Sequence, residues 1–446
     1  MDLPASPAPR RGLSLPTQIF LGLLLGAAVG ILLNEQRASL DAAATWLRGE
    51  PAVIVGPVLD NVIGPIGQVF LRLLLMTVIP LVFASLAVGV AQLGDLADLG
   101  RIGARTFGYF ILTTGLAVIV GLVLVNTVRP GAGLPEETTR RLFAEHRGKV
   151  EGKPPAEFGV QTFVEIVPRN PIRAMADMDM LGVIFFALLV GIGSTRLPGA
   201  QRDLVVTLLQ AIGELMTWII HLAMRLAPYG VFCLICKVTA ELGFDIIKQL
   251  AWYVGTVLVG LGLHLFVALP VLLLLLARVS PWWFFTRVRG VIVTAFSTSS
   301  SAATLPTSLA AAHERLGIPK KIAGFVLPLG ATMNMNGTAL FEGVTVLFLA
   351  QVFGVELSWG QQAIVVLLSV LTAIGAAGVP GGSIPLLMMV LASVGVPPSG
   401  IALIMGVDRL LDMCRTTLNV VGDLTAAVVI ARSEGVAVGA APAATS

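Results

Sequence analysis

The stretch Asp408-Arg-Leu-Leu-Asp-Met-Cys-Arg-Thr-Thr-Leu-Asn-Val-Val-Gly-Asp423 concentrates charged and amide side chains in one part of the chain. Residues 357–407, which precede it, contain no charged side chain. Arg409 lies on the flank of the predicted helix, where its side chain could reach an interface. Five polar residues are separated by 4, 3, 4 and 4 positions, and on a helix they fall within an arc of about 80°: Asp408, Asp412, Arg415, Asn419 and Asp423.

Composition identifies the surroundings of this helix. Of the 446 residues, 56% are hydrophobic and 12% are charged, which is half the charged fraction of an ordinary soluble domain. The mean hydropathy is +0.90. These values exclude a soluble enzyme, and they exclude disorder, which needs low hydrophobicity and high charge. In a multi-pass membrane protein, a charged stripe must face a cavity or a partner, because each charge costs several kcal/mol in lipid.

Net charge and cysteine content exclude further classes. The 29 basic and 26 acidic residues give a net charge of +3, too small and dispersed to indicate a nucleic-acid partner. Three cysteines cannot form a disulfide framework. Cys233 and Cys236 lie in an apolar run without the context of a redox motif, so we interpret them as small residues of one helix.

Apolar runs predict the membrane-spanning helices. Residues 12–33 follow Arg10 and Arg11 as a signal peptide would, but the run is long enough to span a bilayer and no clear cleavage site follows it. The polar segment 128–179 is expected at the surface, because non-helical backbone cannot face lipid. Further spans are expected at residues 61–93, 106–127, 180–195, 204–238, 250–277 and 322–355.

Arginines beside short connections predict the orientation. If the N-terminus is cytoplasmic, the connections that carry arginine all lie inside, as the positive-inside rule requires. The long polar segment then lies outside, where charge constrains topology little. The arginines concerned are Arg101, Arg105, Arg196, Arg202, Arg278, Arg287 and Arg289.

Two uncharged stretches predict re-entrant hairpins. Residues 291–312 contain the run Ser299-Ser-Ser301, and residues 373–385 read AIGAAGVPGGSIP. Serine, glycine and proline leave backbone polar groups that hydrocarbon cannot satisfy, so each stretch is predicted to form two half-helices meeting at a buried tip. Such paired breaks indicate a transporter's binding site. A small-residue packing face would explain the glycines but not the serines.

The span between the hairpins is interrupted by Ala331-Thr-Met-Asn-Met-Asn-Gly-Thr338. Amide and freed carbonyl oxygens are hard ligands that suit a small cation, whereas a structural break would typically show one Pro or Gly. Arg415 could grip a carboxylate with its planar fork, and an Asp could bind an ammonium group. A solute carrying both groups, moved with a cation, fits these residues.

Four motifs resemble those of the dicarboxylate/amino acid:cation symporter family, which contains the glutamate and aspartate transporters. They are Ser299-Ser-Ser301, Asn334-Met-Asn-Gly-Thr338, Gly378-Val-Pro-Gly381 and the segment from Asp412 to Asp423. The resemblance covers nearly the whole chain. It implies an all-α polytopic membrane protein with eight transmembrane helices, two re-entrant helical hairpins, inverted repeats and an elevator-type mechanism. It also implies a homotrimer in the plasma membrane, of the bacterial inner-membrane type, with both termini cytoplasmic.

The same resemblance implies a division of the chain. Residues 1–93 would form scaffold helices 1 and 2, and residues 94–128 helix 3 of the transport domain. Residues 129–245 would form an extracellular segment and scaffold helices 4 and 5. Residues 246–446 would form the transport-domain core: helices 6, 7 and 8, hairpin 1 at about 286–312 and hairpin 2 at about 361–395.

The resemblance also implies the substrate and its ligands. Arg415 would bind a side-chain carboxylate and Asp412 an amino group, which favours L-aspartate or L-glutamate over a C4-dicarboxylate or a neutral amino acid. No cofactor is implied, and sodium ions, protons or both would be the coupling ions. The remaining substrate contacts would be Ser300, Ser301, Thr338, Val379, Thr416 and Asn419.

Two cation sites of the family, the first and the third, can be assigned by position to residues of this sequence. The first would use Asn334, Asn419, Asp423 and the carbonyl of Gly330. A third site would use the hydroxyls of Thr113 and Thr114, but it departs from the family pattern. Asn336 replaces the usual aspartate, and Phe110 replaces a tyrosine. Losing an anionic ligand weakens the attraction for a hard cation, so this third site is expected to be impaired.

Glu342, six residues after Asn336, matches the proton-carrying glutamate of the mammalian relatives. A carboxyl in low dielectric can cycle a proton. The alternative is a glutamate that faces a water-filled crevice or pairs with an arginine. Our hypothesis is that negative charge has moved along this helix from a sodium ligand to a titratable group.

Rival functions fit less well. An intramembrane aspartyl protease needs a Gly-x-Gly-Asp setting that the sequence around Asp423 lacks. A serine hydrolase needs a general base and a Gly-x-Ser-x-Gly elbow; His264 and His313 lie in unsuitable contexts and the elbow is absent. A passive anion channel would favour rings of charge. We therefore expect a transporter and no enzyme, with C4-dicarboxylate symport as the alternative; its partners would be the solute, lipid and copies of itself.

Overall fold

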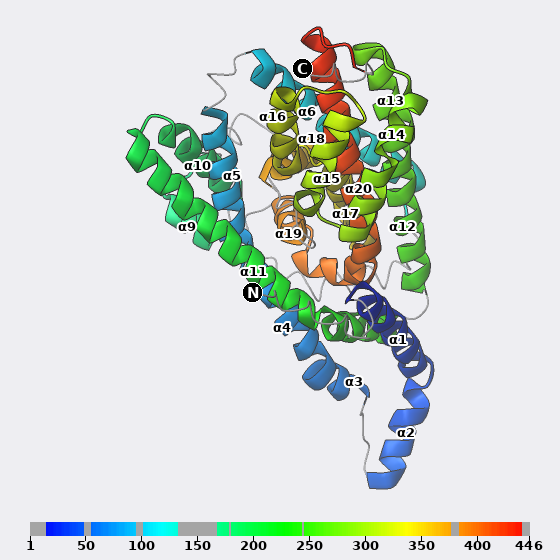
Figure 1. Cartoon of the computed structure of the whole chain (residues 1–446). Helices are drawn as coiled ribbons and strands as arrows, with labels where there is room; N and C mark the ends of the chain where they lie inside the picture. The colour runs from blue at the N-terminus through cyan, green and yellow to red at the C-terminus, as the bar shows by residue number, and fades with distance from the viewer. Residues whose placement is uncertain are drawn as a thin grey trace, which may run out of the picture.

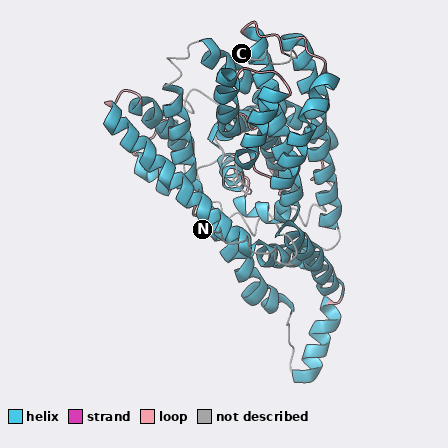
Figure 2. Ribbon diagram, in the orientation of Figure 1, coloured by secondary structure: helices cyan, strands magenta, loops and turns pink. Residues whose placement is uncertain are grey.

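The computed structural model describes residues 15–48, 55–94, 101–132, 167–177, 180–242, 245–375 and 383–438, and every regular element in these ranges is a helix (Figures 1 and 2). The expectation of an all-helical membrane protein is confirmed. The number of eight spans stays a prediction, because Gly182–Ser194 and Trp359–Ile374 are shorter apolar helices. Seven helical runs in the described ranges are long and apolar enough to cross a membrane: Thr17–Glu35, Val55–Ala91, Arg101–Val128, Gly199–Ala240, Ile246–Ala277, Lys320–Val352 and Pro398–Ser433.

The long helix α11 organises the helices of the N-terminal half. It runs obliquely through the molecule in Figure 1, and α1, α4 and α5 pack against it, while α10 packs against α5. The bounds are α1 Leu15–Glu35, α2 Arg37–Arg48, α3 Val55–Val58, the π-helical η1 Leu59–Ile63, α4 Gly64–Leu75, α5 Val78–Gly94, α6 Arg101–Val128, α9 Pro171–Ala176, α10 Met180–Ser194 and α11 Gly199–Leu242.

A glycine seam brings α1 against α11. Gly22, Gly26 and Gly30 are four residues apart and therefore share one face of α1. A Cβ atom at Gly22 or Gly26 would lie 2.5 Å from a backbone carbonyl oxygen of α11. Because lipid offers no hydrophobic drive for helix association, such close backbone packing is what holds membrane helices together.

The C-terminal half packs around α20, which contacts α12, α14, α15, α16 and α17, while α6 lies along α17 (Figure 1). The bounds are α12 Asp245–Leu263, the π-helical η3 His264–Ala268, α13 Leu269–Leu272, the π-helical η4 Leu273–Ala277, α14 Pro281–Thr298, α15 Ser301–Glu314, α16 Lys320–Met333, α17 Asn336–Val352, α18 Trp359–Gly375, α19 Ile384–Ser393, the 3₁₀ turn η5 Pro398–Gly400 and α20 Ile401–Ser433.

Burial follows polarity in the seven long helical runs. The runs Lys320–Val352 and Pro398–Ser433 are the two least apolar and also the two most buried, whereas Thr17–Glu35 is the least buried. Polar side chains are expensive in lipid, so the helices that carry them lie inside the protein and apolar helices cover them. The polar groups of the C-terminal half of the molecule therefore gather in its core.

Two of the three expected helix breaks lie in the described residues, and both occur where the sequence predicts them. α14 and α15, which we call hairpin 1, meet at Ser299, whose backbone adopts a left-handed conformation with φ of 49°. The arms of hairpin 1 extend from Pro281 to Glu314, beyond the expected 286–312. α16 ends at Met333 and α17 begins at Asn336, so the interruption falls inside the predicted motif. α18 and α19, which we call hairpin 2, flank residues 376–382, which lie outside the described residues.

Two short helices were not predicted. α2 follows the first span, and α9 lies inside the polar segment 128–179. The start of α9 has a local cause: the Asn170 side chain accepts hydrogen bonds from the backbone N–H groups of Ile172 and Arg173, and Pro171 occupies the first turn. Hydropathy cannot find such helices, because neither is apolar enough to be a span.

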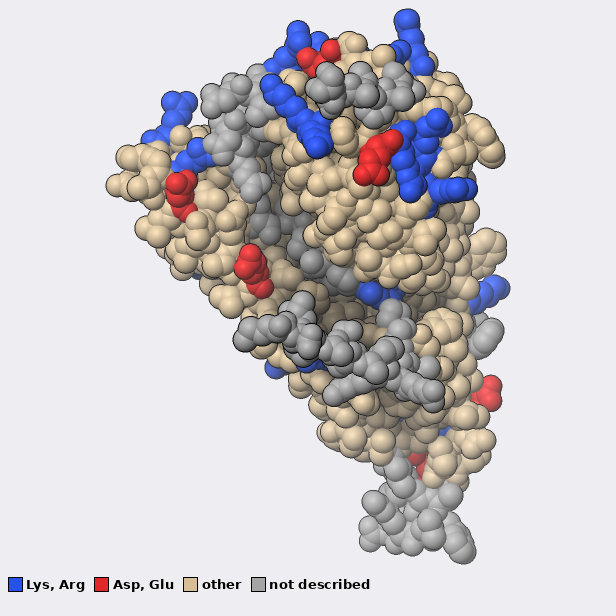
Figure 3. All heavy atoms as spheres, viewed as in Figure 1, with Lys and Arg blue, Asp and Glu red and all other residues tan. Residues whose placement is uncertain are grey.

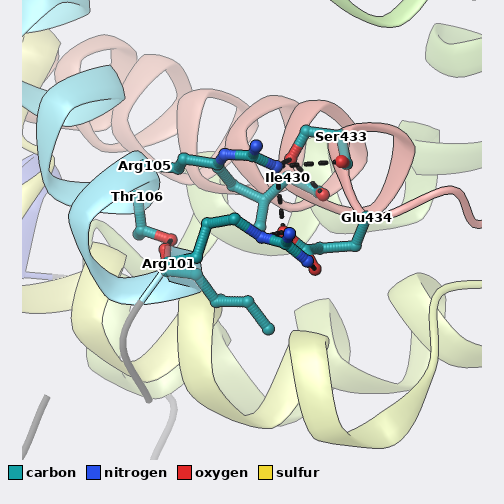
Figure 4. Close-up of polar contacts among 7 residues, drawn as sticks. Arg101, Arg105, Thr106, Ile430, Ser433 and Glu434 are labelled. Atoms are coloured by element: carbon teal, nitrogen blue, oxygen red, sulfur yellow. Dashed lines mark hydrogen bonds and ion pairs between the residues drawn. The ribbon is translucent and has the colours of Figure 1, made fainter. Parts of the chain in front are cut away.

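The end of α20 is tied to the start of α6 by charged groups (Figure 4). Arg101 contacts both carboxylate oxygens of Glu434, at 3.1 and 2.7 Å, and Arg105 donates to Glu434 at 2.9 Å and to the Ser433 carbonyl at 2.9 Å. The hydrogen bond from Arg101 is the main cause that lowers the pKa of Glu434. The pairing therefore stabilises the fold at neutral pH and is lost as pH falls through that lowered pKa. Lys and Arg side chains gather toward this end of the molecule (Figure 3).

Replacing Gly26 by alanine should separate α1 from α11. The added Cβ would meet the Phe232 carbonyl oxygen at 2.5 Å, and backbone on both sides leaves no flexible group to yield. We expect a loss of about 1–3 kcal/mol of stability, measured as a lower melting temperature of the detergent-solubilised protein. The matched control is Gly213→Ala on α11, where no atom lies within 4 Å and the melting temperature should hold or rise. An equal loss of melting temperature in Gly26→Ala and Gly213→Ala would contradict the role of the glycine seam in holding α1 against α11.

Candidate functional site

The polar residues of α20 lie inside the protein and find partners there. Asp408, Asp412, Arg415, Asn419 and Asp423 are all buried. The opposite side of α20 is buried as well, since Val421 and Leu424 are fully enclosed, whereas Leu410 near one end is exposed. The prediction that the charged stripe faces a partner rather than lipid therefore agrees with the geometry, and protein covers most of α20 on every side.

Arg415 is the charged centre of this site. Only 1% of its side chain is exposed. Its Nη2 atom lies 3.0 Å from Asp408 Oδ1 and 2.9 Å from Asp412 Oδ1, and its guanidinium carbon lies 3.9 Å from the centre of the Phe341 ring. Nε and Nη1 have no hydrogen-bond partner among the described residues. Two strong donors are thus buried and left available.

Asp408 and Asp412 are the two acids of α20 that lie beside its arginines. In the structure Arg415 holds both acids, and Arg409 Nη1 lies 3.4 Å from Asp412 Oδ2. Asp412 therefore has a basic group on each carboxylate oxygen, and Asp408 joins the Arg415 cluster because it lies two helical turns before that residue.

Serine side chains lie at the tip of hairpin 1, in the C-terminal half of the molecule that also contains Arg415. Ser300 is the N-cap residue of α15, and its hydroxyl accepts a hydrogen bond from the Ala303 N–H at 3.2 Å. Ser301 is buried in the first turn of α15, and the Ser299 hydroxyl is buried with no hydrogen-bond partner in the described part of the chain. Because α14 and α15 both pack against α20, the expected contacts Ser300 and Ser301 belong to the elements that surround Arg415.

The start of α17 is fitted onto α20. Asn419 accepts a hydrogen bond from the Gly337 N–H at 2.7 Å and donates one to the Thr338 hydroxyl at 3.3 Å. A Cβ at Gly337 would lie 2.6 Å from the Arg415 carbonyl oxygen, so only glycine allows this approach. Two expected substrate contacts, Thr338 and Asn419, are thereby held together beside Arg415. Thr416 is buried next to them on α20.

The expected ligands of the first cation site lie together. Asn334 donates to Asp423 Oδ1 at 3.0 Å, and a Cβ at Gly330 would lie 2.5 Å from the same oxygen. Within the described ranges, no three His, Cys, Asp or Glu side chains gather as a metal cluster. The Asp423 carboxylate instead lies beside the Asn334 amide group and the closely approaching backbone of Gly330, and the oxygens of such residues are of the kind that a hard cation prefers.

The residues of the expected third site also meet. The Thr113 hydroxyl oxygen lies 2.9 Å from the Tyr109 carbonyl oxygen and 3.3 Å from Asn334 Oδ1, and the Thr114 hydroxyl donates to Asn336 Oδ1 at 2.8 Å. The amide nitrogen of Asn336 is buried without a hydrogen-bond partner among described groups. The Asn336 amide oxygen is thus already hydrogen-bonded to Thr114, and this group of residues contains no carboxylate.

Glu342 lies fully buried on α17, 0% exposed. Its Oε2 is 2.7 Å from the Thr372 hydroxyl of α18, and its Oε1 has no hydrogen-bond partner in the described structure. It neither faces open water nor forms an ion pair with an arginine described here, so this conformation does not match the crevice alternative. Val379, the last expected substrate contact, lies outside the described residues.

Three residues of this region make contacts that we did not predict from the sequence. Asp408 pairs with Arg415, Phe341 stacks on the same guanidinium, and Thr372 contacts Glu342. The spacing of seven residues between Asp408 and Arg415 is a signal that could have found the first. Phe341 and Thr372 come from other helices, and no periodicity in the sequence links them to their partners.

Comparison with known proteins agrees with this arrangement. The chain matches the profile of the Sodium:dicarboxylate symporter family over residues 15–433. It is 38% identical to the proton/glutamate-aspartate symporter of Escherichia coli (strain K12), over 94% of this chain and 93% of the relative. It is 36% identical to the proton/sodium-glutamate symport protein of Bacillus subtilis (strain 168), with the same coverage. It is 35% identical to the C4-dicarboxylate transport protein of Bacillus subtilis (strain 168), over 86% and 90%.

Gly330→Ala should disturb the Asp423 carboxylate. The added Cβ would lie 2.5 Å from Asp423 Oδ1 and push it away from Asn334. We expect a loss of about 1–3 kcal/mol of stability and of any stabilisation by sodium. The measurement is the melting temperature in sodium chloride against choline chloride. Gly324→Ala on the same helix is the control, since no atom lies within 4 Å there. A sodium effect of wild-type size in Gly330→Ala would argue against Asp423 as a cation ligand.

Proposed function

The chain belongs to the Sodium:dicarboxylate symporter family, and on that premise we propose that it takes up an acidic amino acid, L-aspartate or L-glutamate, together with sodium ions, protons or both. The observation that carries the proposal is Arg415, a fully buried guanidinium whose Nε and Nη1 have no hydrogen-bond partner among the described residues. A buried cationic group with free donors favours an anionic ligand, and a planar fork suits a carboxylate.

Asp412 supports an amino acid over a dicarboxylate. Asp412 and Asp408 both lie beside Arg415 and would repel a second carboxylate in their direction, whereas an ammonium group would be attracted. Two of the relatives compared above are named for glutamate, one of them also for aspartate. C4-dicarboxylate symport is the second candidate, because a relative named for that transport is nearly as similar.

The proposed ion coupling involves three places: residues of α16, α20 and the break before α17, the start of α17 with its α6 neighbours, and Glu342 on α17. Gly330, Asn334, Asn419 and Asp423 would hold one sodium ion. At the third site the neutral Asn336 stands where the family has a carboxylate, and its Oδ1 already accepts a hydrogen bond from Thr114, so this site would bind sodium weakly or not at all. Glu342 would carry a proton, since it is an acid in a water-free setting with a single partner. The relatives compared include one named for protons alone and one for protons and sodium.

The wider architecture of the family is proposed for this chain as well. It comprises eight spans, two re-entrant hairpins, cytoplasmic termini, a homotrimer, and a transport domain that slides against a scaffold, with no enzymatic step. In support, α1, α4 and α5 pack on α11, while α6, α12, α14, α15, α16 and α17 pack on α20, which carries the polar site. Side chains at seven-residue spacing on α11 leave an apolar stripe for lipid or another copy: Leu208, Leu215, Leu222 and Tyr229.

Uptake by proteoliposomes tests the proposed substrate. Under imposed sodium and proton gradients, labelled aspartate or glutamate should accumulate and labelled succinate should not. Arg415→Gln should reduce uptake by about 100-fold or more, because a buried charged contact is lost. Arg173→Gln, at a surface ion pair, should leave uptake unchanged. Accumulation of succinate alone would favour the dicarboxylate alternative, and currents without accumulation would refute symport.

Two substitutions on α17 should change the coupling ion. Asn336→Asp restores an anionic oxygen beside Thr114. The sodium concentration that gives half-maximal uptake should therefore fall by about tenfold, which corresponds to roughly one charge-assisted contact. Glu342→Gln should abolish uptake driven by a pH gradient alone and keep exchange of internal for external substrate. The measurement is uptake with one gradient imposed at a time. These assignments would be contradicted if Asn336→Asp left the sodium dependence of uptake unchanged, or if the Glu342→Gln variant still showed proton-driven uptake.

A further inference from the structure

The contact between Glu342 and Thr372 joins two helices in the interior of the protein. Glu342 lies on α17 and Thr372 on α18, and neither side chain is exposed to solvent. The Thr372 hydroxyl oxygen is 2.7 Å from Glu342 Oε2 and 2.8 Å from the Leu368 carbonyl oxygen one turn earlier on α18. The second glutamate oxygen, Oε1, has no hydrogen-bond partner within the described structure.

The number of hydrogens decides how this contact works. A threonine hydroxyl has one hydrogen to donate, but three acceptors lie within reach here: Glu342 Oε2 and, at 2.8 and 3.2 Å, the carbonyl oxygens of Leu368 and Ser369. If Glu342 is protonated, its O–H donates to the Thr372 oxygen and the Thr372 hydrogen goes to the Leu368 carbonyl. If Glu342 is ionised, the single hydrogen must leave Leu368, and it is then the only hydrogen bond to a fully buried charge. When Glu342 is protonated, the contacts of the Thr372 oxygen with Glu342 Oε2 and with the Leu368 carbonyl oxygen are both hydrogen bonds, and no charge is buried.

Few ionisable groups compete for this carboxyl. α18 and α19 carry no titratable side chain in their described residues. On the other packed helices the candidates are Tyr109 of α6, Tyr253 of α12, and Arg415 of α20. The Tyr253 hydroxyl is already hydrogen-bonded to Thr345 at 2.8 Å. None of these groups forms an ion pair with Glu342 in the described structure, and Arg415 is itself held by Asp408 and Asp412.

We propose that Thr372 is a positioning residue that accepts the hydrogen of protonated Glu342 and thereby couples proton loading to the packing of α18 against α17. This inference rests on the proposed role of Glu342 as the proton carrier and adds the group that receives the proton's hydrogen bond. When α18 packs on α17, Thr372 provides the acceptor and water is excluded. When the two helices separate, water replaces Thr372 and the carboxyl is free to ionise.

Infrared difference spectroscopy tests the contact directly. Wild-type protein, reconstituted and perfused with aspartate at acidic pH, should show the carbonyl band of a protonated carboxyl that is absent from Glu342→Gln. Thr372→Val, which keeps the shape and removes the hydroxyl, should shift that band to higher wavenumber as a hydrogen bond is lost. Thr372→Ser should restore its position. A band that does not respond to Thr372→Val, or no band that depends on Glu342, would overturn the proposal.

Aspartate binding at acidic pH provides an independent measurement. Thr372→Val should weaken binding by about tenfold, since it leaves a buried donor without an acceptor. The same change in a Glu342→Met background, which has no donor, should cost less than about twofold. Equal losses in both backgrounds would show that Thr372 acts through packing alone. If wild-type protein binds and transports no acidic amino acid, the proposed function fails; if it does while Thr372→Val behaves as wild type, only this inference fails.

Discussion

The ion-pair cluster of Arg415 with Asp408 and Asp412 is the constraint on which the rest of the structure depends. An arginine in the interior of a membrane protein must be paired, and pairing it with two acids requires a helix that never faces lipid. α20 is therefore central and enclosed, and apolar helices must cover it. The same cluster leaves Nε and Nη1 of Arg415 without partners among described atoms, so the feature that dictates the architecture also creates the place for an anion.

Close backbone contacts make this enclosure possible. Gly337 lets the start of α17 rest on the Arg415 carbonyl, and Gly330 leaves room for the Asp423 carboxylate beside α16. Each glycine removes a Cβ from a position where a side chain of the site needs the space. The breaks between α14 and α15 and between α16 and α17 then bring helix ends, with their unpaired backbone groups, toward α20. Polar backbone and polar side chains thus share one interior.

Much of this could be read from the sequence, for identifiable physical reasons. Apolar runs of bilayer length predict the spans, and the 3.6-residue period of a helix places Asp408 to Asp423 on one face. The serines at 299–301 and the asparagines at 334 and 336 mark helix breaks, because such residues are costly in a lipid-facing helix. What periodicity cannot provide is the approach of separate helices. Thr372 meets Glu342 from 30 residues away, and Phe341 stacks on Arg415 across the α17–α20 contact. α2 and α9 escaped because short polar helices depend on caps rather than on hydropathy.

The geometry refines the hypothesis that negative charge moved along α17. Asn336 and Glu342 are six residues apart, which at about 100° per residue places them about 120° apart around the helix. Asn336 accordingly faces Thr114 of α6, whereas Glu342 faces Thr372 of α18. An acid at 342 therefore cannot replace an acid at 336 as a ligand for the same ion. Under the proposed assignments, exchanging one for the other would change which neighbouring helix responds to the bound cation: α6 for a sodium ion held near residue 336, α18 for a proton on Glu342. A change of coupling ion would then also be a change in the helix contact that the ion controls.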